Sequence, residues 1–426
     1  MKNYTTLTPA ERAAELAALR EEYARCKAKG LSLDMSRGKP AGAQLDLSEG
    51  LLTTLTTSAD CIAEDGSDCR NYGVPDGVPE MKKIFADLLE LPEKNIYLAG
   101  ASSLQLMYDA ISRLMLFGAS EGSTPWSTLQ AKGETVKFLC PAPGYDRHFG
   151  LCECFGIEMI PVEMTPVGPD MDAVESLVRD PSVKGIWCVP KYSNPTGVTF
   201  SDETVRRLAK MDCAADDFRI FWDNAYAVHD LYDETEPLLN LFEEAAKAGN
   251  PDRVYIFASF SKITYSGGSV AIFATSDSNL AYARKAFRKQ SICYDKVNQL
   301  RHARYFGDAA GVIAHMKKHA AILRPKFEAV EEIFERELAS CGIGQWSNPK
   351  GGYFISLDLP DNTAKRTFDL CKEAGVTLTS VGETFPYGKD PRDRNLRIAP
   401  SFPTVTDLTA AAEILCLCAK IAYLEK

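Results

Sequence analysis

A lysine that directly follows an apolar run is the residue of this chain with the clearest chemical use. Lys262 comes after Ser259, Phe260 and Ser261, at the end of the candidate strand Val254–Ser259. A lysine amine placed among small polar residues is a candidate for forming a Schiff base with a carbonyl group. The alternative interpretation is a surface lysine that keeps its charge in solvent while its stem packs against the protein.

Two other apolar runs also end in residues that a bound ligand could use. The run Ile220–Asp223 ends in a carboxylate, which is costly to bury unless it meets a cation or strong hydrogen-bond donors. The run Gly185–Val189 leads into the polar, turn-forming segment 190–197, where Asn194 could reach a ligand. An Asn-Pro pair is also typical of a plain turn, so the second assignment stays open at this point.

A third site is suggested by a loop of small residues between an apolar run and a helical pattern. The loop is Gly100-Ala101-Ser102-Ser103, after the run Asn95–Ala99. Free N–H groups and the positive end of the helix dipole favour an anion there, although an ordinary capped helix start is the simpler reading. Tyr145 follows the run Val136–Cys140 and could either stack on a planar ligand or pack in its turn.

The elements that must position these residues alternate between apolar runs and helical patterns. Further runs are Met159–Val162 and Val270–Thr275, which makes seven candidate strands with those above. Continuous apolar runs are typical of strands covered on both faces by helices, and the alternation favours a mostly parallel α/β sheet. Ligands of such sheets bind beyond the carboxyl ends of the strands, where Lys262, Asp223 and Asn194 all occur.

After about residue 310 the pattern changes to that of a second, smaller α+β unit. A long helix is expected over His315–Ser340, short strands near Gly352–Leu357 and Leu396–Ile398, and a last helix over Val405–Tyr423. Another helix is expected over residues 8–30, with Thr8 and Glu11 forming a capping box. We therefore expect a large domain over residues 46–310 and a small domain made of residues 1–45 and 311–426.

The ordered motifs resemble those of the fold-type I, pyridoxal-phosphate-dependent enzymes similar to aspartate aminotransferase. They are Tyr72-Gly73-x-x-x-Gly77, Asn194-Pro195-x-Gly197, Asp223-x-x-Tyr226, Ser259-x-Ser261-Lys262 and Arg397. The segments SRGKP, GASSLQLMYD, PGYDRHF and FSKITYSGG are similar to the divergent class Ic subgroup. The resemblance covers about residues 30–425, and it implies a seven-stranded, mostly parallel sheet in the large domain.

The resemblance implies a role for each cofactor-binding residue. Lys262 would hold pyridoxal phosphate as a Schiff base and move a proton during the reaction, and Asp223 would pair with the protonated ring nitrogen. Tyr226 and Asn194 would hydrogen-bond the ring oxygen, and Tyr145 would stack on the ring. The phosphate would be held by the residues Gly100, Ala101, Ser102, Ser103, Ser259 and Ser261, with Tyr72 reaching it from the neighbouring subunit of a homodimer.

The substrate would be an amino acid or a 2-oxo acid, bound largely by one arginine. By the resemblance, Arg397 would bind the α-carboxylate as a bidentate fork, helped by Gly38 and Asn194. A dicarboxylic substrate needs a second cation, for which Arg37 is favoured over Lys39 and Arg147 because it adjoins Gly38.

One position departs from the family pattern. The family carries a phosphate-binding arginine eight residues after the lysine, whereas this chain has Val270 there. Either other donors, such as Ser261 and Ser266, replace the arginine, or the loop is aligned differently.

The composition excludes several other classes of protein. The net charge of -10 argues against a nucleic-acid partner, and no apolar stretch is long enough for a membrane span. Thirteen cysteines in apolar segments, with no histidines spaced to join them at a metal site, favour free thiols in a reducing compartment such as the cytoplasm. Neither a nucleotide-binding glycine motif nor a G-x-S-x-G nucleophile motif is present.

The leading hypothesis is an aminotransferase that moves the amino group of L-aspartate or glutamate to 2-oxoglutarate in a ping-pong cycle. An aminotransferase or β-lyase for an aromatic or neutral amino acid is the alternative. A non-catalytic ligand sensor with this fold is a further one, although sensors of that kind carry an N-terminal DNA-binding domain that this sequence has little room for.

Overall fold

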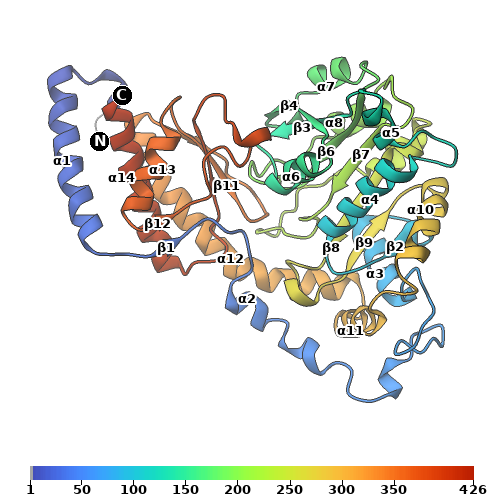
Figure 1. Cartoon of the computed structure of the whole chain (residues 1–426). Helices are drawn as coiled ribbons and strands as arrows, with labels where there is room; N and C mark the ends of the chain where they lie inside the picture. Colours follow the sequence, from blue (N-terminus) through green and yellow to red (C-terminus); the bar gives the residue numbers. More distant parts are fainter. Residues whose placement is uncertain (1–2) are drawn as a thin grey trace.

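An eight-stranded sheet forms the centre of the larger part of the molecule in the computed structural model, which describes residues 3–426 (Figure 1). The strand order is β2-β9-β8-β7-β6-β3-β4-β5. The strands are β2 (Ile96–Leu98), β3 (Lys137–Ala142), β4 (Glu158–Thr165), β5 (Gly168–Pro169), β6 (Val183–Cys188), β7 (Arg219–Asp223), β8 (Val254–Ser259) and β9 (Ala271–Ala274). The five strands from β8 to β4 run parallel, whereas β9 and β5 are antiparallel to their neighbours.

The expected α/β fold is confirmed, with one strand more than predicted. The extra strand, β5, pairs only Gly168 and Pro169 with the end of β4. Two residues are too few to produce a recognisable alternation of apolar and polar side chains, so the sequence pattern could not reveal this strand.

Both faces of the sheet are buried, as the continuous apolar runs predicted. Alternate residues of each strand belong to different cores: Ile220 and Trp222 pack in one, and Phe221 packs in the other. The first core is covered by α3 (Pro79–Leu89), α7 (Met171–Leu177), α8 (Asp202–Lys210), α9 (Leu241–Lys247) and α11 (Lys296–Phe306). The second is covered by α4 (Ser103–Phe117), α5 (Trp126–Ala131), α6 (Asp146–Cys154) and α10 (Asp277–Gln290).

A smaller unit, drawn on the left of Figure 1, is built from the two ends of the chain. Its strands are β1 (Leu33–Asp34), β10 (Gln345–Trp346), β11 (Ile355–Asp358), β12 (Val376–Thr377) and β13 (Asn395–Ile398). Its helices are α1 (Pro9–Ala28), α13 (Ala364–Glu373) and α14 (Val405–Glu425). One apolar core joins Leu19 of α1 to the C-terminal elements. This packing supports the discontinuous small domain, whose boundaries stay a prediction.

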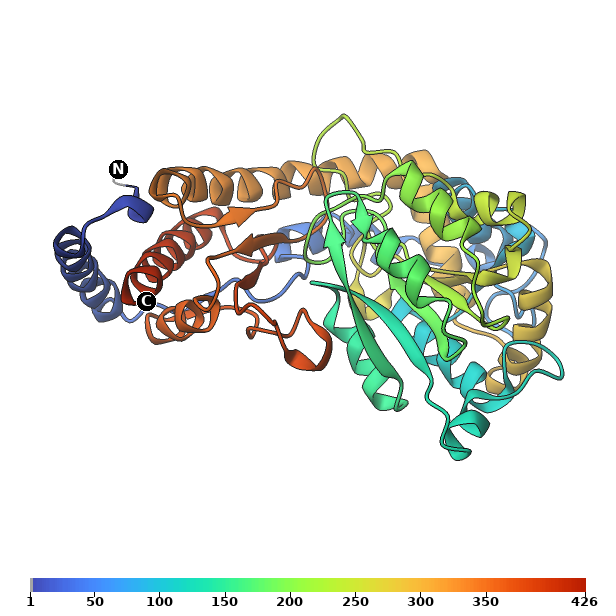
Figure 2. The same ribbon diagram turned by 90° about the horizontal axis from the view of Figure 1, so that it is seen from above.

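One long helix connects the two parts of the molecule. Helix α12 (Ala309–Glu337) runs from the core of the larger part to the core of the small unit, along one side of the molecule in Figure 2. It begins at Ala309 and not at His315, because Asp308 caps it by accepting a hydrogen bond from the Gly311 N–H. The short helix α2 (Gly42–Asp46) packs against it.

The predicted start of the first helix is confirmed. Thr8 accepts a hydrogen bond from the Glu11 N–H, and the Glu11 carboxylate accepts one from the Thr8 N–H in return. Within residues 3–426, no helix has the length and apolarity that a bilayer crossing requires.

Candidate active site

The parallel sheet brings the predicted residues of three strands to one edge. Strands β6, β7 and β8 are neighbours, and the segments after them carry Asn194, Asp223 and Lys262. The Asn224 N–H donates to the Phe257 carbonyl at 2.8 Å, so β7 and β8 stay paired up to this edge. The edge is therefore the place where the sequence analysis expects the chemistry.

The Lys262 amine lies above an aromatic ring and close to a carboxylate. Its Nζ atom is 4.9 Å from the centre of the Tyr226 ring. Burial lowers the pKa of the Lys262 amine, and the nearby negative charge of Asp223 opposes that shift. The Tyr353 hydroxyl donates to the Lys262 backbone carbonyl at 3.2 Å, which holds the main chain in place and leaves the side chain free to reach a ligand.

Asp223 has one paired oxygen and one unpaired oxygen in the interior. Its side chain is only 3% exposed, and Oδ2 accepts a hydrogen bond from His148 Nε2 at 3.1 Å. The other oxygen, Oδ1, is buried and bonds to no group of the described residues. Because a buried charged oxygen without a partner is costly, this atom indicates a missing donor such as a protonated ring nitrogen.

His148 is a residue of the site that the sequence analysis missed. Its ring stacks on Trp187 with the centroids 4.3 Å apart, and this packing fixes the imidazole against Asp223. Tyr145 approaches the same imidazole edge-on at 5.0 Å. The available signal was the three-residue spacing between Tyr145, the residue that precedes α6, and His148 in the first turn of that helix.

Two of the tyrosines predicted for the cofactor lie near these groups: Tyr226 is buried and Tyr145 is half-buried. Burial raises the pKa of the Tyr226 hydroxyl well above its usual value, and the Asp223 charge adds to the effect. Burial likewise raises the pKa of the Tyr145 hydroxyl. Both phenols therefore remain protonated at neutral pH and can donate hydrogen bonds.

The expected anion loop lies beside the serines that precede the lysine. Gly100 accepts a hydrogen bond from the Ala271 N–H, and Ala271 is the partner of Ser259 in the β8–β9 register. Gly100 adopts a φ of +67°, which a glycine tolerates. Ser102 is the N-cap of α4, but its side chain makes no capping hydrogen bond and stays available. The loop thus meets the strand end that carries Ser259.

The remaining serines of this corner bond to one another, and Val270 does not contribute a cation. Ser259 Oγ lies 2.9 Å from Ser261 Oγ, and Ser266 donates to the Ser261 carbonyl at 2.6 Å. Val270 is 1% exposed in the apolar core. The position of the family arginine is therefore a core position in this chain.

Arg397 lies across from the sheet edge, on strand β13 of the small unit. Its Nη1 atom donates to Asp146 Oδ1 at 2.9 Å and to Asn194 Oδ1 at 3.4 Å, and its Nε atom donates to Thr379 Oγ1 at 3.3 Å. The guanidinium also lies 5.0 Å from the centre of the Phe354 ring.

Gly38 supports this arrangement by leaving space for the same ring. A Cβ atom on Gly38 would stand 2.2 Å from Phe354 Cζ. Only glycine therefore permits the close approach of the segment SRGKP to the ring under the Arg397 guanidinium.

The other candidate residues lie at the surface. Arg37 is exposed, the Lys39 amine lies 4.0 Å from the centre of the Phe402 ring, and Arg147 Nε is 3.7 Å from Asp146 Oδ2. Tyr72 is 75% exposed. The structure thus gathers the cofactor residues of β6 to β8 and Arg397, and leaves Tyr72 and Arg37 exposed at the surface.

The gathered groups fit pyridoxal phosphate. Lys262 offers an amine for its aldehyde, the unpaired Asp223 Oδ1 fits a protonated ring nitrogen, and the loop from Gly100 offers donors for its phosphate.

Comparisons with known proteins give a consistent picture. The sequence model of the aspartate amino-transferase family matches residues 7–426. An aspartate aminotransferase of Corynebacterium glutamicum is 48% identical over 407 residues, which cover 96% of this chain and 93% of that protein. A putative aminotransferase of Mycolicibacterium smegmatis is 50% identical over 405 residues, covering 95% and 94%. The crystal structure of an aspartate transaminase from Corynebacterium glutamicum matches with a TM-score of 0.96 at 46% identity, over 99% of both chains.

Proposed function

Because the chain belongs to the aspartate amino-transferase family and is an aminotransferase, we propose that it transfers the amino group of L-aspartate, or of glutamate, to 2-oxoglutarate. The reaction would follow a ping-pong course with pyridoxal phosphate attached to Lys262. The observation that supports this most is the buried Asp223 with one unpaired oxygen, at the strand next to the one that leads into Lys262.

The cofactor, when bound, supplies an aldehyde for an amine and a ring that withdraws electrons from the substrate carbon. In our proposal Lys262 attaches it and then holds and moves the proton at the substrate α-carbon. The lowered pKa of the Lys262 amine supports this role, because a neutral amine can accept a proton. Asp223 would keep a proton on the ring nitrogen, and His148 would orient Asp223 through their hydrogen bond.

The remaining cofactor contacts stay as predicted from the resemblance. Tyr226 and Asn194 would donate to the ring oxygen, and Tyr145 would lie against the ring. The raised pKa of the Tyr226 hydroxyl supports its role as a donor, because the phenol keeps its proton. The phosphate would be held by Gly100, Ala101, Ser102, Ser103, Ser259 and Ser261. The Ser266 hydroxyl would support this group by its hydrogen bond to the Ser261 carbonyl.

Arg397 would bind the substrate α-carboxylate, with Asn194 and a backbone donor at Gly38 beside it. The Phe354 ring under the guanidinium supports this role, since it fixes the plane of the arginine. For the second carboxylate of aspartate we propose Arg37, whose side chain is exposed next to Gly38. Replacing Arg37 with Ala should then raise the KM for aspartate and leave that for a monocarboxylic amino acid unchanged.

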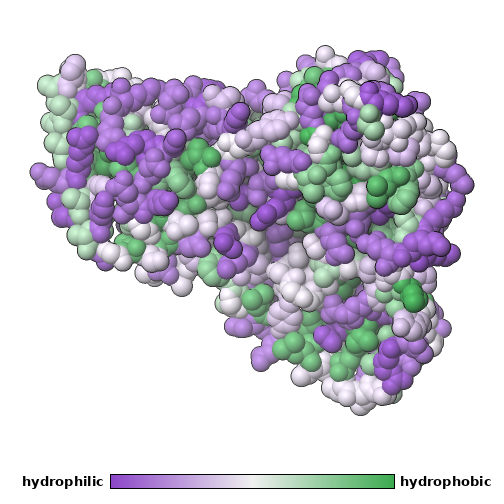
Figure 3. Space-filling view, viewed as in Figure 1, coloured by the Kyte–Doolittle hydropathy of each residue, from purple (hydrophilic) through white to green (hydrophobic). Residues whose placement is uncertain are grey.

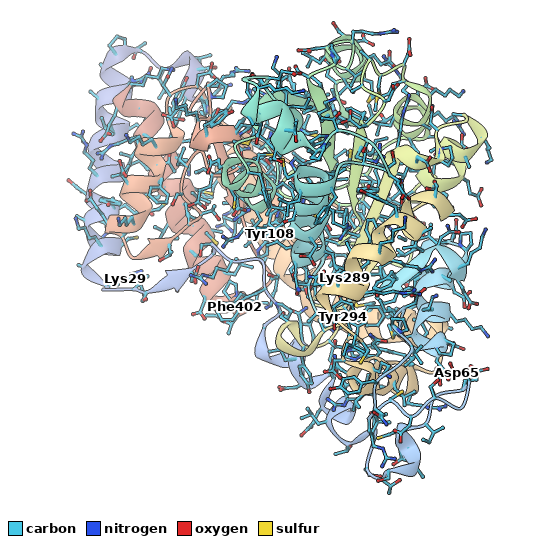
Figure 4. All side chains as sticks on the ribbon, turned by 45° about the vertical axis from the view of Figure 1, so that its right-hand side comes forward. Lys29, Asp65, Tyr108, Lys289, Tyr294 and Phe402 are labelled. Carbon is cyan, nitrogen blue, oxygen red and sulfur yellow. The ribbon has the colours of Figure 1, made fainter. Side chains whose placement is uncertain are left out.

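We further propose a homodimer in which Tyr72 reaches the partner's phosphate site. The backbone around Tyr72 is fixed, because the buried Lys296 donates to the Gly73 carbonyl at 2.8 Å, yet the aromatic ring is exposed. Apolar residues appear as several separate patches on the face drawn in Figure 3. Figure 4, turned by 45° from that view, labels Tyr108 and Tyr294 near its middle. The exposed apolar residues include Leu52, Tyr72, Tyr108, Leu116, Phe117 and Ile292. Sedimentation velocity tests this assembly.

The thirteen cysteines are all free thiols, which supports a reducing compartment such as the cytoplasm.

The proposed reaction is tested by an absorbance spectrum of the purified protein with pyridoxal phosphate, before and after L-aspartate. A visible band that aspartate removes and 2-oxoglutarate restores would support both the cofactor and the substrate. A band unchanged by aspartate would refute the substrate and direct the test to aromatic and neutral amino acids. No band, or a band retained in Lys262→Ala, would refute the role of Lys262.

A further inference from the structure

The arginine proposed for the substrate carboxylate already has a carboxylate partner within the chain. Asp146 Oδ1 accepts from Arg397 Nη1 at 2.9 Å, and the two side chains are 24% and 10% exposed. This pair is therefore better shielded from water than a surface ion pair, so its charges attract each other more strongly.

The hydrogen bonds of Arg397 leave no complete fork for a second carboxylate. An arginine binds a carboxylate through two parallel N–H groups, either on Nη1 and Nη2 or on Nε and Nη2. Here Nη1 donates to Asp146 and Asn194, while Nε donates to Thr379. Nη2 is the nitrogen of Arg397 with no acceptor among residues 3–426. An incoming carboxylate must therefore replace an existing partner to bind through two hydrogen bonds.

We propose that Asp146 is a specificity-determining residue that competes with the substrate carboxylate for Arg397. This inference rests on the function proposed above. The carboxylate of the substrate takes the place of Asp146 at Nη1, on the side of the guanidinium where Asn194 also lies. Thr379 is the weaker competitor, because its hydroxyl is neutral and its hydrogen bond is longer.

Asp146 also joins the two parts of the molecule at this point. It belongs to the first turn of α6 beside the sheet, whereas Arg397 belongs to β13 of the small unit. Two residues before Asp146, the Gly144 N–H donates to the Thr384 carbonyl at 2.7 Å. Because this backbone bond keeps the two segments together, the Asp146 carboxylate remains next to Arg397 when substrate is absent. Every carboxylate ligand must then displace Asp146 from Arg397, and this displacement reduces the free energy of binding.

Removing the charge of Asp146 should therefore strengthen carboxylate binding. Asp146→Asn keeps the shape of the side chain and an oxygen acceptor for Arg397, but it removes the negative charge and with it the ion pair, so the remaining hydrogen bond is weaker. We expect the affinity for a carboxylate ligand to rise about three- to tenfold, and KM to change more than kcat. If Asp146 instead serves to hold Arg397 in its binding orientation, the affinity falls.

The test is calorimetric titration of the cofactor-loaded enzyme with succinate, a dicarboxylate with no amino or oxo group to react. The variants are Asp146→Asn, Arg397→Ala and Glu153→Gln, the last of which removes the same charge from an exposed position of α6. Tighter binding to Asp146→Asn alone, with binding to Arg397→Ala reduced about a hundredfold, supports the inference. Equal or weaker binding to Asp146→Asn overturns it and leaves the proposed role of Arg397 standing. Unchanged succinate binding to Arg397→Ala overturns both the inference and the proposed role of Arg397. If the affinity of Glu153→Gln for succinate rises as much as that of Asp146→Asn, the effect is one of overall charge and the proposed competition is overturned.

Discussion

One carboxylate lies shortly before strand β7 and another is the last residue of that strand, and we predict opposite effects on stability from neutralising them. Asp217, two residues before the strand, is paired through both oxygens: Lys184 donates to Oδ1 and Trp126 donates to Oδ2, each at 2.7 Å. Among residues 3–426, Asp223 at the carboxyl end has a partner for Oδ2 and none for Oδ1. The two aspartates are thus matched in type and lie at opposite ends of β7, and they differ in whether one oxygen remains unpaired among residues 3–426.

The expected magnitude follows from the unpaired oxygen. Leaving a buried polar atom unsatisfied costs about 1–3 kcal/mol, and more when the group is charged. In the cofactor-free protein, Asp223→Asn replaces this charged oxygen with a neutral amide and should therefore raise the free energy of unfolding by about 1–3 kcal/mol. For a chain of this length that corresponds to roughly 1–3 °C in Tm. Turnover should fall about 100- to 1,000-fold, the usual effect of removing one electrostatic contact to the reacting group.

Asp217→Asn should do the reverse. It breaks an ion pair that is largely shielded and weakens the Trp126 hydrogen bond, so the free energy of unfolding should fall by about 1–3 kcal/mol. Turnover should stay close to that of the unsubstituted protein, since Asp217 lies at the opposite end of the strand from Lys262.

Thermal unfolding of both cofactor-free variants, followed by turnover with added pyridoxal phosphate, checks the prediction. Adding the cofactor should raise the Tm of the unsubstituted protein more than that of Asp223→Asn, because a ligand stabilises only the state that binds it. If Asp223→Asn lowers the Tm as much as Asp217→Asn does and keeps its turnover, then the unpaired oxygen has no functional meaning and the reasoning is refuted.

Three further predictions concern groups around the site. Gly38→Ala should push Phe354 away from the Arg397 guanidinium and raise KM about tenfold for both substrates, as steady-state kinetics would show. Tyr353→Phe should lower the free energy of unfolding in urea by about 1–3 kcal/mol, because both the Lys262 carbonyl and Gln44 Nε2 lose a partner. Burial and the neighbouring His315 lower the pKa of His319 to about 4; since the unfolded chain then binds more protons between about pH 4 and 6.5, stability should rise with pH in that window. His319→Gln should flatten this rise, measured as unfolding free energies at pH 5 and pH 7.

The sequence could predict those features that depend on neighbours along the chain. Apolar runs reveal strands, and the parallel order places their ends together, so Lys262, Asp223 and Asn194 could be assigned to one edge. The contacts of Asp146 with Arg397 and of Tyr353 with Lys262 join residues that are far apart in sequence. No periodicity records such contacts, and packing of the small unit against the sheet creates them.

Two differences have the same local cause. Val270 is spaced like the family arginine, but its side chain is directed into the core by the strand that begins at the next residue. The long helix begins earlier than its apolar pattern indicated, because a capping aspartate and not an apolar residue sets its start. In both places the local backbone geometry determines where a side chain points or where a helix begins. The spacing of residues along the sequence does not specify that geometry.

The contact between the first and last helices has a consequence for synthesis on the ribosome. Arg12 of α1 donates to the carbonyls of Tyr423 and Leu424, and the rings of Tyr4 and Tyr423 stack at 6.4 Å. At about 5–20 residues per second, α1 waits roughly 20–80 seconds for these partners to be made. Leu19 is the buried residue within α1, and the exposed positions of the helix are mainly alanines and charged residues, so the waiting segment exposes few large apolar side chains that could aggregate. The emergence of α14, and not that of the sheet, is then the event that completes the small unit.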